Sequence, residues 1–225
     1  MFIVLLLLLV VIIVFGPQLW AKRILNKYSH HRKDFPGTGG EFAQHLLTQF
    51  EMHDVKVEIS ETGDHYDSTA KAVRLIRPNL EGKSLTAVAT AAHEVGHAIQ
   101  DKVNYQPLQA RTRLVKIAQI TEKVGAGLMV MIPIVAIFTR VPALGILMFI
   151  GGLMSLGTAV IVHLVTLPVE WDASFKRALP ILANYVSKRD QWAARRILTA
   201  CALTYVASSL TSLLNLWRWL AILRR

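Results

Sequence analysis

The chain has a single cysteine, and this scarcity excludes an internal disulfide. Cys201 is the only thiol among 225 residues and lies in an apolar run near the C-terminal end. One thiol gives no disulfide framework, so the sequence leaves the redox compartment open. Internal repeats and low-complexity segments are also absent outside the apolar runs.

Acidic residues are few: 15 stand against 25 lysines and arginines, which gives a net charge of +10. Fifteen of the cations lie in residues 22–123 and six in residues 176–196. No basic stripe is interleaved with aromatic residues that could stack on bases, so we expect no nucleic-acid partner. The cations in residues 22–33 are instead expected to contact anionic lipid head groups.

Charge is almost missing from three long stretches, residues 2–20, 124–167 and 198–216. A membrane-spanning helix needs about 20 apolar residues, so the middle stretch is long enough for two passes and each of the others for one. The first stretch has neither a basic n-region nor a small-residue cleavage site, and it predicts a retained anchor rather than a signal peptide. The loop near Arg140 carries one cation, so the positive-inside rule predicts cytoplasmic polar segments and an external N-terminus.

The chemistry of the chain is indicated by His93-Glu94-Val95-Gly96-His97, an HExxH motif. Two histidines four residues apart lie on one helical face, where both can bind a zinc ion beside the glutamate that acts as general base. Ser84 is placed to cap this helix, and apolar residues follow with helical spacing. The alternative is a buried helix with two hydrogen-bonded histidines, which is a costly burial without a metal.

A catalytic zinc needs a third protein ligand, and no third histidine follows the motif closely. The best carboxylate is Glu170, in the segment Pro168-Val169-Glu170-Trp171-Asp172-Ala173-Ser174. Two predicted spans separate His97 from Glu170, which returns both residues to the same membrane face. We therefore expect Zn²⁺ to be held by His93, His97 and Glu170.

The HEVGH and PVEWDA segments, the N-terminal span, Asp64-His65-Tyr66-Asp67 and residues 202–207 together resemble the YugP-like membrane zinc metallopeptidases of bacteria. The resemblance implies a membrane-embedded, glutamate-ligated (gluzincin-type) zinc peptidase, distantly similar to HtpX-like and CAAX-prenyl-type proteases. In those relatives the third-ligand motif reads ExxAD. Here Ala173 matches, Ser174 replaces the aspartate, and Asp172 stands two residues earlier.

Four further residues are candidates for supporting roles around the metal. Asp172 either orients a zinc-bound histidine or caps the following helix. His65 and Tyr66 either help to hold an oxyanion or belong, with the neighbouring aspartates, to a turn. His163 lies in a predicted span, where it is expected to face the site or another helix.

The predicted fold class is a mainly α membrane protein with four transmembrane helices and a small α+β zincin-like catalytic domain. Thr38 and Glu41 predict a capping box, and residues 55–59 and 72–76 alternate as two short strands. The predicted segments are an anchor at 1–21, a cytoplasmic catalytic domain at 22–123, a transmembrane hairpin at 124–167, a third-ligand segment at 168–197 and a last span at 198–225.

The predicted function is hydrolysis of a protein or peptide substrate, membrane proteins included, at the cytoplasmic side of the bacterial cell membrane. Two alternatives stay open: a non-enzymatic membrane scaffold that keeps zinc structurally, and a zinc hydrolase that acts on a lipid-linked substrate. The sequence does not give the oligomeric state.

Overall fold

The structure is a computed structural model that describes residues 2–139, 143, 146–147, 150–151, 162 and 165–213. Its elements are, in chain order, α1 (Phe2–Lys27), α2 (Gly39–Gln49), β1 (Lys56–Ser60), β2 (His65–Asp67), β3 (Ala72–Ile76), α3 (Arg77–Leu80), α4 (Leu85–Lys102), α5 (Gln106–Thr139), the π-helix η1 (Asp172–Ala178), α7 (Leu179–Ala183) and α8 (Gln191–Leu213). Residues 165–171 are also helical and lead directly into η1.

The two strands predicted from alternation are present as β1 and β3, and the predicted capping box is present at the start of α2. The strands pair in parallel, and the unpredicted strand β2 pairs antiparallel with β3, so the order is β1-β3-β2. Strand β2 therefore forms an edge of the sheet. Val73 and Leu75 of β3 are fully buried and attach the sheet to the core.

Helix α4 is the central element of the fold. Its start is capped as predicted, because the Ser84 hydroxyl accepts a hydrogen bond from the Ala87 backbone at 3.1 Å. Fifteen of its 18 residues are buried, so the helix is covered on nearly every side. Many of them are alanines, and these small side chains let α2, α8 and η1 approach it closely.

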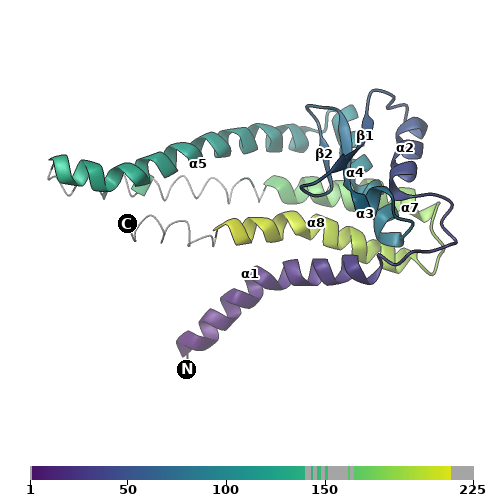
Figure 1. Cartoon of the computed structure of the whole chain (residues 1–225), viewed down its shortest axis with the longest axis horizontal. Helices are drawn as coiled ribbons and strands as arrows, with labels where there is room; N and C mark the ends of the chain where they lie inside the picture. The colour runs from purple at the N-terminus through teal and green to yellow at the C-terminus, as the bar shows by residue number, and fades with distance from the viewer. Residues whose placement is uncertain are drawn as a thin grey trace.

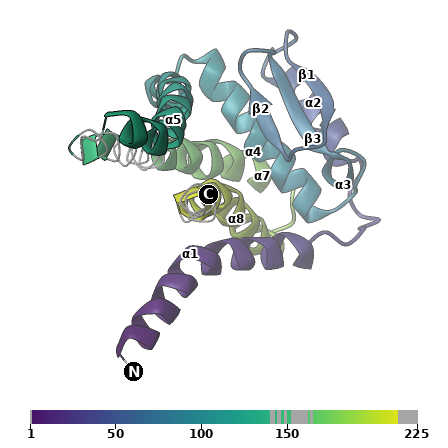
Figure 2. The same ribbon diagram turned by 60° about the vertical axis from the view of Figure 1, so that its left-hand side comes forward.

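The sheet and helices α2, α3 and α4 gather at one end of the molecule (Figure 1). Helices α1, α5 and α8 extend away from that end, and α1 packs along α8. In a second view, the sheet lies on the side of α4 that faces away from α1 (Figure 2). The site residues lie where α4, η1 and the start of α5 come together.

The prediction of four transmembrane helices is wrong for the part of the chain that the structure describes. Within those residues, no helix combines the length and the apolar character that crossing a membrane requires. One reason is that apolar residues counted toward a span lie in the core: Leu198, Ala200 and Ala202 of α8 are fully buried. The hairpin predicted at 124–167 falls largely outside the described residues.

Candidate metal centre and active site

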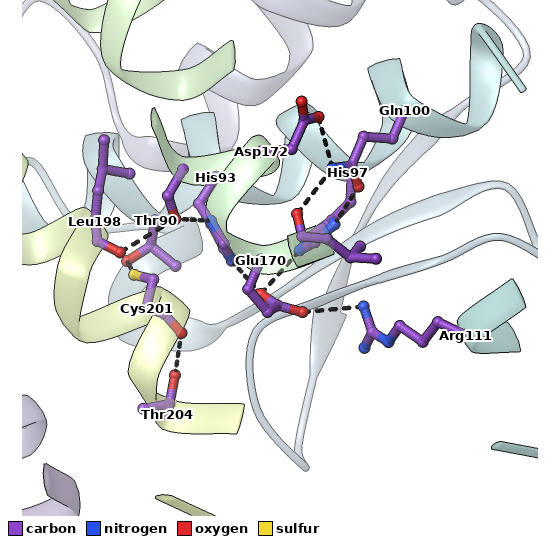
Figure 3. A network of polar contacts seen from close by, with 12 residues as sticks. Thr90, His93, His97, Gln100, Arg111, Glu170, Asp172, Leu198, Cys201 and Thr204 are labelled. Carbon is purple, nitrogen blue, oxygen red and sulfur yellow. Dashed lines mark hydrogen bonds and ion pairs between the residues drawn. The ribbon is translucent and has the colours of Figure 1, made fainter. Parts of the chain in front are cut away.

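His93, His97 and Glu170 converge on one buried point, as the sequence predicted (Figure 3). The two histidines come from α4, and Glu170 comes from the helical residues 165–171. Nε2 of His93 lies 3.2 Å and Nε2 of His97 lies 3.3 Å from Oε2 of Glu170. All three side chains are at most about 5% exposed, and their donor atoms lie within 4.8 Å of one another.

The tautomer of His93 follows from its hydrogen bond with Ser174. The Ser174 hydroxyl donates its single hydrogen to the backbone oxygen of Leu198 at 3.1 Å. It must therefore accept the hydrogen bond that joins it to Nδ1 of His93 at 3.0 Å. The proton of a neutral His93 ring is thus on Nδ1, and the lone pair of Nε2 faces Glu170.

Gln100 sets the tautomer of His97, as Ser174 sets that of His93. The Gln100 amide nitrogen donates to the Val169 carbonyl and to Asp172 Oδ2, both at 2.9 Å. Both partners are acceptors, so the amide orientation is fixed and Gln100 Oε1 faces Nδ1 of His97 at 2.9 Å. Nδ1 of a neutral His97 therefore carries the proton, and its Nε2 lone pair also faces Glu170.

When both histidines are neutral, three electron-pair donors thus face one another with no hydrogen between them. Nε2 of His93 is a buried atom without a hydrogen-bond partner among the described residues. A buried polar atom of this kind costs about 1–3 kcal/mol, and a carboxylate beside two lone pairs adds repulsion. A cation removes both costs, and two imidazoles with a carboxylate form a donor set that suits catalytic zinc. The residues present therefore fit a metal.

Glu170 is ionised despite its complete burial. Burial raises the pKa of Glu170, but positive charge and hydrogen bonds from His97 and His93, when their rings are protonated, outweigh burial and hold this pKa below its usual range. Nη1 of Arg111, on α5, also donates to Oε1 of Glu170 at 3.0 Å. One carboxylate oxygen therefore faces the histidines while the other is held by a guanidinium.

Glu94 is the buried carboxylate next to this cluster. It lies between the two histidines in the chain and lines a cavity of about 540 Å³ together with His93. Burial is the main cause that raises the pKa of Glu94 to about 7; His93 lowers this pKa, while the nearby charges of Glu170 and Asp64 also raise it. A carboxylate with this pKa can both take and return a proton near neutral pH.

The supporting residues predicted from sequence fall in different places. Asp172 contacts Gln100 and Arg177 and makes no helix-capping bond, so it reaches His97 only through Gln100. His65 lines the cavity of Glu94, whereas the Tyr66 hydroxyl donates to Asp101 at 2.8 Å. His163 lies outside the described residues.

The turn explanation holds for both aspartates next to His65 and Tyr66. Asp64 accepts hydrogen bonds from the Ile76 backbone and from Asn79, and burial raises its pKa. Asp67 accepts from two backbone amides and from Arg74. These carboxylates tie β2 to the segments beside it.

Sequence reasoning missed Gln100, Arg111 and the direct role of Ser174. Gln100 follows His97 by three residues on the same helix, a spacing that places both side chains on one face. This spacing could therefore have indicated the contact between Gln100 and His97 from the sequence alone. Arg111 is 59 residues from Glu170 in the chain, and no pattern in the sequence connects them.

The π-helix η1 brings the supporting residues together. A π-helix repeats its backbone hydrogen bonds every five residues, and the Arg177–Asp172 bond at 2.7 Å spans five residues. Helix α4 meets η1 at Gly96, where an added Cβ would lie 2.8 Å from the backbone oxygen of Ala173. Only glycine permits this approach, which places Glu170 and Ser174 against the two histidines.

Comparisons with known proteins agree with this geometry. The model of a family described as "Putative neutral zinc metallopeptidase" matches residues 3–224. A protein of Bacillus subtilis (strain 168), named "Putative membrane protease YugP", is 34% identical over 227 residues, which cover 99% of this chain and 96% of that protein. No solved structure matches the chain.

Proposed function

Because the chain belongs to the neutral zinc metallopeptidase family, we propose that it is a zinc-dependent endopeptidase of the gluzincin type. Zinc is its cofactor, as the family and the buried His-His-Glu group both indicate. The proposed ligands are His93, His97 and Glu170. The observation that carries the proposal is the convergence of these three donors beside Glu94 and an open cavity.

In the proposed reaction, water attacks the carbonyl carbon of a peptide bond. Zinc supplies a Lewis acid that polarises this carbonyl and lowers the pKa of the attacking water. Glu94 accepts the proton that the water loses as the new carbon–oxygen bond forms. Glu94 then passes this proton to the nitrogen as the carbon–nitrogen bond breaks, so that a neutral amine leaves.

A non-enzymatic zinc scaffold is less well supported by the same contacts. Structural zinc sites are closed by four protein ligands, whereas catalytic sites keep a position open. Among the described residues the cluster contains three such side chains. A cavity also borders His93 and Glu94, and a purely structural site has no use for it.

The test is cleavage of casein and of quenched fluorescent peptides by the purified protein. Hydrolysis is expected in the presence of zinc, loss of hydrolysis after dialysis against a chelator, and recovery when zinc is restored. Lipid-linked substrates are assayed in parallel, since their exclusive hydrolysis would favour the lipid-linked alternative. Zinc binding without any hydrolysis would favour the scaffold.

The proposal includes action at the cytoplasmic side of a bacterial cell membrane. The Bacillus subtilis relative is named a membrane protease. Helix α5 also exposes several large apolar side chains, among them Ile120, Val124 and Phe138. Exposed apolar surface of this kind is common at membrane-contacting sites, and the cations of residues 22–123 are attracted to anionic head groups.

Flotation with lipid vesicles tests the membrane association. The full chain is expected to float with vesicles that contain phosphatidylglycerol. If the protein stays at the bottom of the gradient with every lipid composition, this part of the proposal is wrong, while the peptidase assay remains unaffected.

A further inference from the structure

Two cavities flank the proposed metal ligands, and the residues that line them differ. The first, of about 540 Å³, is lined by His93 and Glu94 together with Cys201 and Thr204. The second, of about 270 Å³, is lined by His97 and Arg111. Arg111 reaches Glu170 from one side, while Cys201 and Thr204 lie on the other (Figure 3). A peptide whose scissile bond lies at the cluster therefore has a cavity on each side of that bond.

We name the smaller cavity the Arg111 cavity. The charged side chains that line it are all cations. Its lining contains two cations and no carboxylate among the described residues: Tyr66, Ser68, His97, Leu108, Arg111, Thr112, Val115, Lys116 and Gln119. In contrast, the lining of the larger cavity contains Asp64 and Glu94 and no lysine or arginine among the described residues. The two sides of the proposed scissile bond thus have opposite electrostatic character.

Two carboxylates near the Arg111 cavity are already paired with cations. Asp101, which accepts the hydrogen bond of Tyr66, is paired with Lys71. Glu170 is paired with Arg111 on one oxygen and faces the two histidines with the other. Lys116 lines the cavity and is exposed, and it makes no ion pair among the described residues.

We propose that the Arg111 cavity binds a carboxylate of the substrate on one side of the bond that is cut. This inference rests on the proposed peptidase function and adds a substrate preference to it. The cavity is slightly smaller than the roughly 300–1,000 Å³ of a drug-sized pocket, so it suits one side chain or one chain end. The carboxylates of a peptide are acidic side chains and the free C-terminus, and guanidinium and ammonium groups bind both.

The experiment compares quenched fluorescent peptides that differ at one position near the cleaved bond. One series carries Glu, Gln or Lys at each position on either side of that bond, with an amidated C-terminus. A second series carries alanine at these positions and ends two residues after the bond, with a free or an amidated C-terminus. The first series detects an acidic side chain and the second a terminal carboxylate.

The variant that tests the cavity is Lys116→Glu, and its matched control is Arg113→Glu. Arg113 is also exposed on α5 but does not line the cavity. The parent chain is expected to cleave the best carboxylate peptide about fivefold faster than its neutral partner, measured as the ratio of kcat/KM values. Lys116→Glu should remove or reverse this ratio, and Arg113→Glu should leave the ratio unchanged. High salt should reduce the ratio, because Lys116 is exposed.

The outcomes separate the two proposals. Zinc-dependent cleavage with equal rates on charged and neutral peptides would overturn the carboxylate site and keep the peptidase. A preference that survives Lys116→Glu, or that Arg113→Glu removes equally, would also overturn the site. Failure to hydrolyse any peptide in the presence of zinc would overturn both.

Discussion

At the scale of single residues, Glu94 and Glu170 are both buried carboxylates but differ in their contacts. Glu94 faces a cavity, whereas Glu170 faces two histidines and Arg111. Replacing Glu94 by Gln keeps the size of the side chain and removes its ability to accept a proton. Turnover should fall by about 10²–10⁴-fold, while bound zinc stays near one per chain. Metal analysis and peptide assays of the same sample measure both, and near-parent turnover would refute the general-base role.

Replacing Glu170 by Ala should weaken zinc binding, which the Glu94→Gln substitution leaves intact. The change removes the carboxylate oxygen that lies 3.2 Å and 3.3 Å from the two histidine nitrogens. Zinc affinity and activity should therefore fall together, in contrast to Glu94→Gln. Competition with a coloured chelator gives the affinity. Parent-like zinc binding in Glu170→Ala would show that another residue completes the metal site.

Ser174 is predicted to support zinc binding without touching the metal. Ser174→Ala leaves the buried Nδ1–H of His93 without its acceptor, so the ring loses the contact that sets its orientation. Changes in such supporting contacts weaken metal affinity by about 10–100-fold. Chelator competition measures this loss, and the absorption spectrum of the Co²⁺-substituted protein reports any change in ligand geometry.

Thr166→Val is the matched control for Ser174→Ala. Thr166 is also buried, but among the described residues its hydroxyl donates to the Val162 carbonyl one turn earlier and contacts none of the proposed ligands. This variant loses a buried hydroxyl of similar size and should keep the zinc affinity of the parent. Equal losses in the two variants would mean that Ser174 acts through general stability.

The sequence indicates the proposed metal ligands better than the residues that hold these ligands in place. The HExxH spacing indicates His93 and His97 because one metal requires both on a single helical face, whereas Glu170 was indicated as the best remaining carboxylate, by the predicted membrane parity and by the family resemblance. The supporting contacts of Ser174 and Gln100 could be inferred only once the backbone of η1 was known. Arg111 was not predictable, because it depends on how α5 leaves the end of α4.

At the scale of elements, the contact between α4 and η1 depends on Gly96. Helix propensity alone predicts that Gly96→Ala stabilises α4 by about 1 kcal/mol. The added Cβ would lie 2.8 Å from the Ala173 backbone oxygen, so η1 must move, at a cost of roughly 1–3 kcal/mol. We expect a lower free energy of unfolding and weaker zinc binding, measured by denaturant titration and by chelator competition.

Gly127→Ala provides the control for this prediction. Gly127 also lies in a helix, α5, but an added Cβ there meets no described atom within 4 Å. Its substitution should follow propensity and raise stability by up to about 1 kcal/mol. If Gly96→Ala also raised the free energy of unfolding, the close approach of α4 and η1 at Gly96 would not exclude a larger side chain.

Local patterns predicted several elements, whereas packing decided others. The cap at Ser84, the capping box at Thr38 and the strands β1 and β3 follow from short-range chemistry. The π-helix η1 was not predictable, since an α-helical spacing does not join Asp172 to Arg177. Strand β2 is three residues long, and too short for alternation to be recognised.

At the scale of the whole molecule, apolar composition was misread where helices pack on one another. A buried helix and a membrane-spanning helix are similar in composition, and the sequence does not state which surface covers an apolar side chain. Helix α8 contains such residues, and they pack against α1, α4 and η1. The start of α8 also carries Arg195 and Arg196, which lie beside aromatic rings.

The metal is expected to stabilise the whole fold, because its proposed ligands come from two segments that the chain separates widely. His97 and Glu170 are 73 residues apart in the chain, and a bound metal would join their two segments directly. Zinc at about 1,000 times its dissociation constant adds about 4 kcal/mol to the free energy of unfolding. For a chain of this size the Tm should then fall by on the order of 10 °C when a chelator removes zinc. Differential scanning fluorimetry measures this shift, and restored zinc should reverse it. Glu170→Ala should show a Tm that responds little to zinc or chelator, and a large response in that variant would mean that the metal stabilises the fold from a different site.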